Sequence, residues 1–441
     1  MPLWLHADET QYVQHGEKKA YVLSFCSLVC GKRCLLAVIP THLMIVEEHV
    51  NKTLWALLAW LRYELECLHA GRYPAQDWQG NDFRDHRSKL SGARLPVRAR
   101  ALAMKGDRKF LHEAYRWGRS WAHTNCCRHC LASKKPGANL WTDMSDTAGW
   151  KNTISPAPSA GPLAGFLPAV DDLFHTLWVN GSGSDLVGSC LCWLACLGVF
   201  ADPDAGTDFQ VADAFVTFHG EAVGDGRLEA DDEAAEGGDH QPRAWNEAQL
   251  NEQLRRAHLL FLRWAKESRA PNTQETFTTK LLHCVSKRQA PQCGGKGCDT
   301  RLTLLWLDAL LRMPGLQAVL SDPSVAAHAV FPPSRVCLCV NLLAYFVFTI
   351  SAEGDLLSQG AARKLQLVGD GFVKTYLGLA GEAVRHGAAL FKVRPKLHGL
   401  WHLSQDIKIL NPKMWSCILD ESFMGVVARV AEAVHPRTRE S

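Results

Sequence analysis

The sequence lacks the short motifs that mark several common enzyme classes. It contains no Walker-type phosphate loop, no Gly-x-Gly-x-x-Gly dinucleotide fingerprint and no Gly-x-Ser-x-Gly nucleophile elbow. These absences argue against nucleotide hydrolases, Rossmann dehydrogenases and α/β-hydrolases. The sequence also shows no internal repeat, which argues against a solenoid or a propeller.

Targeting and membrane signals are also missing from the sequence. No basic segment followed by an apolar core and a small-residue cleavage site opens the chain. The longest apolar runs, Leu186–Phe200 and Val336–Ile350, are shorter than the roughly 20 residues that a membrane-spanning helix needs. We therefore expect a soluble, intracellular protein without a membrane partner.

The chain carries little net charge, only +3 over 441 residues, but its charges are unevenly distributed. One basic stretch could meet phosphates and runs from Arg84 to Lys109. Acidic residues crowd the segment 219–243, which we predict to be a flexible loop because it offers few apolar side chains for a core. The sum of charges does not indicate a nucleic-acid partner, whereas the basic stretch is compatible with one.

Sixteen cysteines are scattered through long apolar segments, and 47% of all residues are hydrophobic. A short secreted disulfide framework has a different pattern, so we expect reduced thiols that pack as small hydrophobic side chains. The length and the apolar content are sufficient to bury a substantial core.

The first quarter of the chain has a recognisable order of secondary structure. Short apolar runs at Leu3–His6, Ala20–Leu28 and Cys34–Ile39 predict an antiparallel meander of three strands. Leucines at helical spacing between Asn51 and Gly71 predict an amphipathic helix. Arg100–Lys105 predicts a fourth strand, which gives the order β-β-β-α-β.

The remainder of the sequence is predominantly helical in pattern. We predict helices at 110–117, 185–200, 245–268, 358–384 and 421–434, a Gly/Cys turn at 292–299 and a short strand at 415–419. A Pro/Gly/Ser-rich connector occupies residues 155–168. The predicted divisions are a first core part (1–110), a Cys-containing connector (111–169), a mainly helical insertion (170–390) and a C-terminal core segment (391–441).

Acidic residues stand where the predicted strands and the last helix end or begin. Asp8 follows the first strand, Asp107 follows the fourth, and Glu421 opens the C-terminal helix. Adjacent central strands would bring the two aspartates together, and Glu421 could supply a third oxygen ligand to a pair of Mg²⁺ or Mn²⁺ ions that act on a phosphodiester. Each acid alone fits an ordinary turn or cap equally well. The neighbours Glu9 and Asp420 could take the places of Asp8 and Glu421.

These motifs resemble those of DDE transposases of the CACTA-type and related eukaryotic element families. In such families an acid ends strand one, a second ends strand four, an Asp- or Cys-x-x-His motif follows, and a glutamate begins a helix after a helical insertion. Leu5-His6-Ala7-Asp8, Met104-Lys105-Gly106-Asp107, Asp172-Leu173-Phe174-His175 and Asp420-Glu421-Ser422 match these patterns. The resemblance implies an α/β fold, with an RNase H-like mixed sheet core interrupted by a large all-α insertion.

The resemblance also implies functional roles for individual residues. Asp8, Asp107 and Glu421 would bind Mg²⁺ or Mn²⁺ for DNA strand cleavage and transfer, and Asp172 with His175 would support them. The basic segment before the last helix would meet DNA through Arg394, Lys396, His398 and Lys408. DNA is the expected partner, the nucleus the expected location in a eukaryote, and a homo-oligomer is a candidate state. The first strand begins near Met1 with no room for an upstream DNA-binding module, so we expect a truncated or repurposed copy.

Cys127 and Cys130 have the spacing of half a zinc site. The second half would have to come from Cys293 and Cys298 or from histidines, and related transposases carry a similar pair shortly after the second acid. A reduced pair without metal is the alternative, and a thiol nucleophile is disfavoured because no ordered base accompanies it. The main alternative to an enzyme is a scaffold that retains the fold and binds nucleic acid or protein.

Overall fold

The computed structural model describes residues 1–11, 19–119, 121–155, 160–201, 247–286, 288–323, 325 and 331–433. The chain divides into two compact units, which are considered separately. Unit 1 comprises residues 1–175 together with 412–441, and unit 2 comprises residues 176–411. The acidic segment 219–243, predicted to be a flexible loop, lies outside the described residues.

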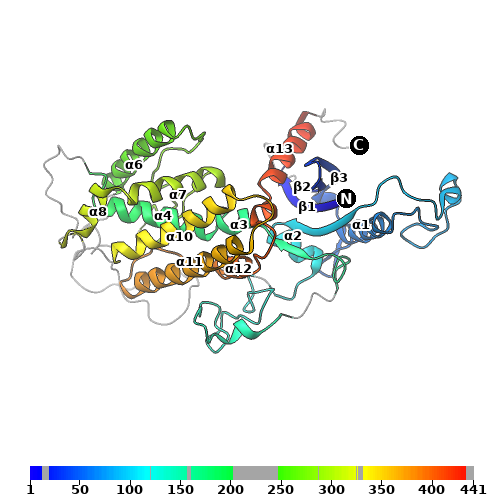
Figure 1. Cartoon of the computed structure of the whole chain (residues 1–441), viewed down its shortest axis with the longest axis horizontal. Coiled ribbons are helices and arrows are strands. Elements are labelled where there is room, and N and C mark those ends of the chain that lie inside the picture. Colours follow the sequence, from blue (N-terminus) through cyan, green and yellow to red (C-terminus); the bar gives the residue numbers. More distant parts are fainter. Residues whose placement is uncertain are drawn as a thin grey trace. The chain divides into compact units, whose positions relative to one another are not determined.

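Unit 1 is built on a mixed five-stranded sheet (Figure 1). Its strands are β1 (Pro2–Gln11), β2 (Lys19–Ser27), β3 (Arg33–Pro40), β6 (Arg100–Gly106) and β7 (Ala169–Asp171). They lie in the order β3-β2-β1-β6-β7. β1 pairs antiparallel with β2, which pairs antiparallel with β3, whereas β1, β6 and β7 run parallel. The predicted meander and the return of a fourth strand after a helix are both present.

One face of the sheet is covered by helices that form the main core of unit 1. α1 (Lys52–Ala70) begins where the Asn51 side chain accepts a hydrogen bond from the Leu54 amide and ends at Gly71, whose φ is 70°. α1 and α2 (Arg108–Tyr115) pack their apolar side chains against residues of β1, β2 and β6. The predicted leucine stripe is therefore the buried face of α1.

The C-terminal part of unit 1 differs from the sequence prediction. Residues 415–419, predicted as a strand, instead run from the end of a 3-10 turn (Pro412–Trp415) through a two-residue link into helix α13 (Ile418–Ala433). Pro412 has no amide hydrogen for a strand ladder, which favours the turn. α13 packs on β1. The helix thus begins three residues before Glu421, which lies in its first turn.

Short elements complete the described part of unit 1. They are a hairpin of β4 (Val46–Glu47) and β5 (Val50–Asn51), the 3-10 turns Thr41–Leu43, His86–Leu90 and Gly149–Asn152, and helix α3 (Leu173–Leu177), which crosses into unit 2. The segment between α2 and β7 is mostly loop.

The described residues of unit 2 form helices and loops without a multi-residue strand. The helices are α4 (Ser182–Cys196), α6 (Glu247–Glu267), α7 (Gly297–Leu311), α8 (Pro314–Ser321), α10 (Pro333–Ala352), α11 (Gln359–Arg385) and α12 (Pro395–Gln405). α4 is buried from Ser182 to Ala195, which explains why its sequence is mostly apolar from Leu186 onward. The turn predicted at 292–299 ends earlier than expected because α7 begins at Gly297.

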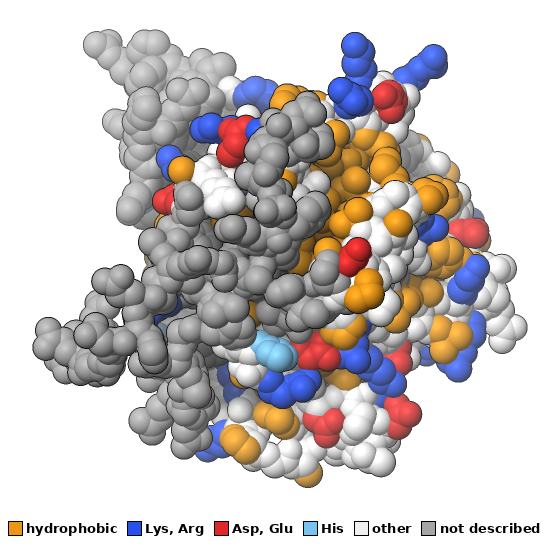
Figure 2. All heavy atoms as spheres, turned by 90° about the vertical axis from the view of Figure 1, so that its left-hand side faces the viewer, with side chains coloured by type: hydrophobic (Ala, Val, Ile, Leu, Met, Phe, Trp, Pro, Cys, Tyr) orange, Lys and Arg blue, Asp and Glu red, His pale blue; other side chains and the backbone are white. Residues whose placement is uncertain are grey.

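α10 is the one helix among the described residues that is long and apolar enough to cross a membrane by length and composition. The helix reaches 20 residues, longer than the apolar run Val336–Ile350 from which no spanning segment was predicted. Half of its most apolar window is buried within the protein, as in the core helix of a globular protein. Phe348 remains exposed, and Figure 2 shows further hydrophobic side chains on the surface of the helical region.

All sixteen cysteines are free thiols in the structure, and ten of them are buried. Most of the buried thiols lie in apolar surroundings that raise their pKa, as burial does for Cys190 and Cys293. These cysteines therefore pack as small hydrophobic side chains.

Candidate functional site in the sheet unit

Asp8 and Asp107 follow paired positions on neighbouring parallel strands. Ala7 of β1 pairs with Gly106 of β6, and each aspartate is the next residue along its chain. The two strands approach so closely here that a Cβ at Gly106 would lie 2.5 Å from the Ala7 carbonyl oxygen. The parallel register therefore places Asp8 and Asp107 side by side, one residue beyond the pairing of Ala7 with Gly106.

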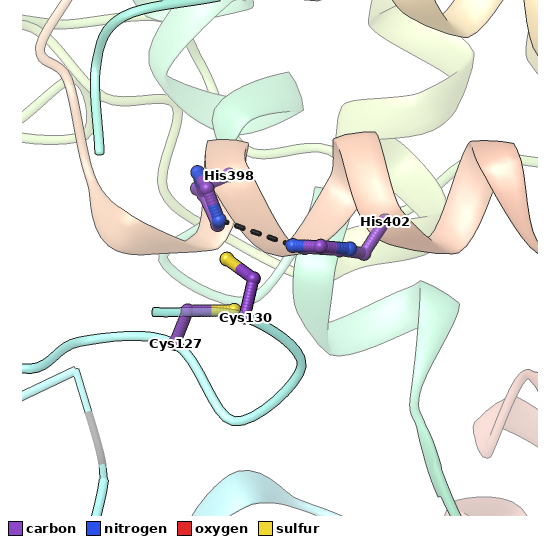
Figure 3. Close-up of side chains that lie close together, drawn as sticks. All are labelled: Cys127, Cys130, His398 and His402. Carbon is purple, nitrogen blue, oxygen red and sulfur yellow. Dashed lines mark hydrogen bonds between the residues drawn. The ribbon is translucent and has the colours of Figure 1, made fainter. Parts of the chain in front are cut away.

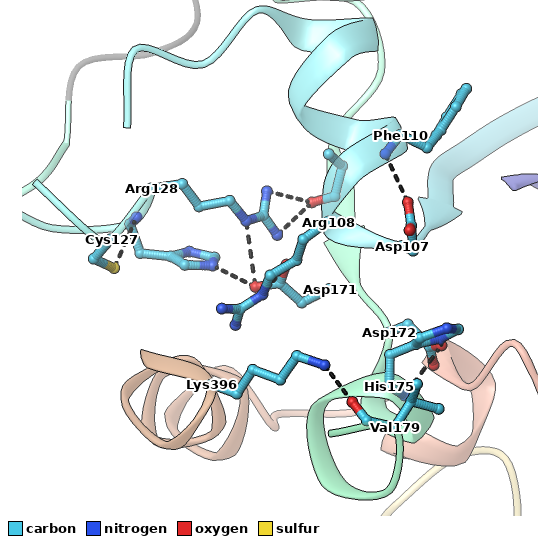
Figure 4. A network of polar contacts seen from close by, with 12 residues as sticks. Asp107, Arg108, Phe110, Cys127, Arg128, Asp171, Asp172, His175, Val179 and Lys396 are labelled. Atoms are coloured by element: carbon cyan, nitrogen blue, oxygen red, sulfur yellow. Dashed lines mark hydrogen bonds and ion pairs between the residues drawn. The ribbon is translucent and has the colours of Figure 1, made fainter. Parts of the chain in front are cut away.

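The surroundings of the two aspartates differ from each other. Asp8 lies within β1, which continues to Gln11, and not after its end as predicted; the side chain is only 9% exposed. Asp107 caps α2, and its Oδ1 accepts a hydrogen bond of 2.6 Å from the Phe110 amide. Figure 4 shows this cap. Asp107 therefore caps a helix, whether or not it also binds a metal ion.

His6 lies two residues before Asp8 and therefore on the same face of β1. It pairs with Ser24 of β2 on one side and Lys105 of β6 on the other, and the residue is 2% exposed. Neither ring nitrogen has a hydrogen-bond partner within the described part of the chain. Burial lowers its pKa from 6.5 to about 4, although Asp420 opposes this shift, so the imidazole is neutral at physiological pH.

Asp420 on α13 is held by two cations from the sheet. Its carboxylate lies 2.7 Å from Lys105 Nζ and 2.9 Å from Arg33 Nε. Burial favours the protonated acid, but Lys105 and the other nearby cations outweigh it and lower the pKa of Asp420. Lys105 also donates to the Ser416 carbonyl oxygen at 3.3 Å. Asp420 therefore fastens the start of α13 to the sheet.

Glu421, the predicted third ligand, lies in α13, but its side chain falls outside the described structure. Because the Asp420 carboxylate is already neutralised by Lys105 and Arg33, Glu421 is the better candidate of the two neighbours for a metal ligand. Among the residues that the structure describes, neither Asp8 nor Asp107 belongs to a group of three potential ligands at metal-binding distance.

Asp172 and His175 form the predicted pair. Asp172 Oδ2 and His175 Nδ1 are in hydrogen-bond contact, as Figure 4 shows. Asp172 Oδ1 also accepts hydrogen bonds from the Phe174 amide at 2.8 Å and the Cys417 amide at 3.0 Å. The buried Asp172 carboxylate thus orients the imidazole and ties α3 to the segment that leads into α13.

These polar groups share one neighbourhood around the buried thiol of Cys417. Burial raises the pKa of Cys417 well above its ordinary value. The nearby charges that also act on this thiol are those of Asp172, Lys105, Asp420 and Asp8. Residues from the first and last parts of the chain therefore meet on the sheet face that carries Asp8.

Cys127 and Cys130 form a turn in which backbone amides point at the sulfurs. The His129 amide donates to Cys127 Sγ at 3.2 Å, and the Ala132 amide donates to Cys130 Sγ at 3.4 Å. Each donor lies two residues after the cysteine whose sulfur accepts. Donation from backbone N–H groups favours the thiolate, as metal binding requires. In the metal-free chain the contact with the Cys127 sulfur and burial outweigh this donation and raise the pKa of Cys130.

His398 and His402 lie one turn apart on α12 and bring two nitrogens together. Their Nε2 atoms are 3.1 Å apart, and the rings meet nearly edge to face. Two nitrogens bound to one tetrahedral zinc ion at 2.0–2.1 Å would be separated by about 3.3 Å. Figure 3 draws this pair together with Cys127 and Cys130. Both pairs carry donor atoms that could hold a metal ion.

The predicted DNA-binding residues all lie in unit 2, but their side chains differ in burial and in the contacts they make. Arg394 makes a bidentate ion pair with buried Asp185, at 2.7 and 3.1 Å, and donates to Gln292. Lys396 donates to the Val179 carbonyl oxygen (Figure 4). His398 is buried, whereas Lys408 is exposed. Of these four, Lys408 has the side chain that is most accessible to an external phosphate.

The sequence reasoning overlooked several residues of this region. Lys105 could have been noticed because it is a charged residue in an otherwise apolar predicted strand, and His6 because it alternates with Ala7 toward the face of Asp8. His402 lies four residues after His398, a spacing that places both on one face of a helix. Asp171 offered no sequence signal, since its partners Arg108, Arg128 and His129 are distant along the chain.

A scan against protein-family models finds no match to this chain, and a search of curated proteins finds none either.

Proposed function

We propose that this chain is a transposase-like DNA-processing protein that carries out metal-dependent DNA strand cleavage and transfer. The observation that carries the proposal is the register that sets Asp8 beside Asp107 on the central parallel strands β1 and β6. An antiparallel meander, a helix and a parallel fourth strand agree with the RNase H-like core that the sequence resembles. In a eukaryotic cell such a protein would act in the nucleus.

The residues present have the chemistry that Mg²⁺ or Mn²⁺ requires. Asp8 and Asp107 supply carboxylate oxygens, the preferred ligands of these hard cations, and Glu421 on α13 would supply a third. The bound ions would activate the attacking oxygen and stabilise the leaving oxygen of a phosphodiester. The Asp420 contacts with Lys105 and Arg33 fix the start of α13, the helix that carries Glu421.

His175, oriented by Asp172, would accept or return a proton near this site. His6 stays neutral because its pKa is about 4, so its imidazole adds no positive charge beside the metal-binding acids. Neither role requires the side chains to move out of the contacts described above.

We also infer that the Cys127–Cys130 pair supplies two thiolate ligands to a zinc ion. The Cys-x-x-Cys spacing and the amide donors to both sulfurs support this inference.

A non-enzymatic scaffold is the second candidate, and it also has specific support. Asp107 caps α2 and Asp420 is neutralised by two cations, so both acids have roles that need no metal. Such a protein would retain the fold and bind nucleic acid or a protein partner.

The deciding experiment is nicking of supercoiled DNA by the purified full chain with Mg²⁺ or Mn²⁺. The variants are Asp8→Asn, Asp107→Asn and Glu421→Gln, with Asp143→Asn as the control because Asp143 closes a turn in the connector. Asparagine caps helices as well as aspartate does, so Asp107→Asn removes the charge without removing the cap. Loss of nicking in the three variants and its retention in the control support the enzyme. Absent or unchanged nicking throughout favours the scaffold.

A further inference from the structure

The carboxylate of Asp171 is a meeting point for three basic side chains within unit 1. Asp171 ends β7 and is buried; its Oδ2 lies 3.1 Å from His129 Nε2 and 3.3 Å from Arg128 Nε. Its Oδ1 faces Arg108 Nε at 3.7 Å. Figure 4 shows the contact of the Asp171 carboxylate with Arg128. A carboxylate with so many basic partners is fixed in place on the end of the sheet.

Two of these partners, Arg128 and His129, are the residues between Cys127 and Cys130. Arg128 also donates to the Ala169 carbonyl oxygen through both terminal nitrogens, at 3.2 Å each. The guanidinium lies 4.5 Å from the centre of the Trp117 ring. Both residues between the cysteines are thus anchored to β7, and the turn can adopt few other conformations.

We propose that Asp171 is the positioning residue of the Cys127–Cys130 pair and holds its two sulfurs ready for a thiophilic divalent ion such as zinc. This inference rests on the zinc site proposed above. The contact with His129 fixes the peptide whose amide donates to Cys127 Sγ, so the carboxylate acts on the sulfur through one residue. Groups of this kind, one shell beyond the ligands, set ligand orientation and metal affinity.

The same carboxylate connects the cysteine turn to the carboxyl end of β6. Arg108 is the first residue of α2 and directly follows Asp107, the helix cap. A displacement of Asp171 would therefore affect both the turn and the start of α2. This link distinguishes Asp171 from an isolated surface ion pair, which contributes little.

The first test is the zinc affinity of the full chain, measured by competition with a chromogenic chelator. Asp171→Asn should bind zinc about 10–100-fold more weakly than the wild type, the usual effect of removing an outer-shell partner. Asp171→Glu should recover part of the affinity, because it restores the charge on a longer side chain. Asp143→Asn, which removes a charge elsewhere in the connector, should leave affinity unchanged. Equal affinities in Asp171→Asn and the wild type would overturn the proposal.

A second measurement separates failure of the positioning role from failure of the zinc site. Amide hydrogen exchange of the peptide covering residues 126–133 is compared in metal-free wild type, Asp171→Asn and Asp143→Asn. Faster exchange in Asp171→Asn alone supports the positioning role even if the wild type binds no zinc, a result that would refute only the zinc site. If Asp171→Asn exchanges as slowly as the wild type, and the wild type binds no zinc, both the positioning role and the zinc site are refuted.

Discussion

The two units bury a carboxylate in contrasting ways. In unit 2, Asp185 on α4 meets a single bidentate arginine, Arg394; burial raises its pKa and the arginine opposes that shift only in part. In unit 1, Asp420 has two cations, Lys105 and Arg33, and its pKa is lowered although burial acts in the opposite direction. The same residue type therefore sits on opposite sides of its ordinary pKa in the two units.

The immediate surroundings of the two carboxylates differ as well. The Asp185 pair is closed on itself, with Gln292 taking the remaining arginine donor, as expected of a pair that secures helix packing. The sheet face around Asp420 also carries buried polar atoms without a partner among the described residues, on Trp4, His6 and Ser24. Native folds rarely leave such atoms together, and functional sites are the usual exception. Four predictions test this contrast.

The largest expected effect on stability comes from breaking the Asp185–Arg394 ion pair of unit 2. Arg394→Met leaves the buried Asp185 carboxylate without its cation, and we expect a loss of about 3–5 kcal/mol in the free energy of unfolding. The loss should be smaller at pH 5 than at pH 8, because Asp185 can then take up a proton. Urea denaturation at both pH values measures it. Arg335→Met, which breaks an exposed pair with Glu382, should cost less than about 1 kcal/mol.

The second prediction concerns the pH dependence that His6 gives to unit 1. In the unfolded chain His6 takes up a proton near pH 6.5, whereas in the folded chain it does so only near pH 4. The folded state therefore loses stability as the pH falls between these values, by about 3 kcal/mol at roughly 1.4 kcal/mol per unit. Urea midpoints from pH 7 to pH 4.5 should show this slope in the wild type and in His86→Gln, and a shallower slope in His6→Gln.

The third prediction sharpens the role of the two cations on Asp420. Lys105→Met removes one cation and leaves Arg33, so we expect a smaller loss than for Arg394→Met, about 2 kcal/mol. The pKa of Asp420 should rise, which moves its acid-induced loss of stability to higher pH. Denaturation at pH 7 and pH 4 tests both statements. A cost equal to that of Arg394→Met would show that Arg33 does not compensate.

The smallest effect separates the structural and chemical roles of Asp107. Asp107→Ala removes the cap of α2 and should cost about 1 kcal/mol, whereas Asp107→Asn should cost a few tenths. Asn51→Ala, which removes the corresponding cap of α1, is the matched control and should also cost about 1 kcal/mol. If DNA nicking is lost in both Asp107 variants but retained in Asn51→Ala, the charge of Asp107 and not its cap is required. Thermal unfolding and the nicking assay provide the two readouts.

Local signals predicted a substantial part of the fold. The strands β1, β2, β3 and β6 and helix α1 follow from alternation, leucine spacing and the caps at Asn51 and Gly71, all encoded within short windows of sequence. The predicted strand at 415–419 was wrong because Trp415 ends a 3-10 turn and Ile418 and Leu419 begin α13. A short apolar run does not distinguish a strand from a helix.

The candidate site was less accessible to sequence reasoning. Asp8 and Asp107 were identified from their places after apolar runs, but the contacts of Asp420 with Lys105 and Arg33 join residues more than 300 positions apart. Similarly, the role of Asp171 depends on the turn at Cys127, about 40 residues earlier in the chain. Propensities carry no information on such pairs, since they act within a few residues.

The sequence by itself determined strands β1, β2, β3 and β6, helix α1 and its buried side, and which acids stand beside the central strands. The tertiary structure alone decided which charges meet: parallel pairing of β1 with β6 aligns Asp8 with Asp107, and the packing of α13 on β1 delivers Asp420 to Lys105. The physical reason is the distance along the chain over which each kind of interaction acts. Hydrogen-bonded local structure is set by neighbouring residues, whereas the position of a buried charge is set by the distant partner that offsets its desolvation.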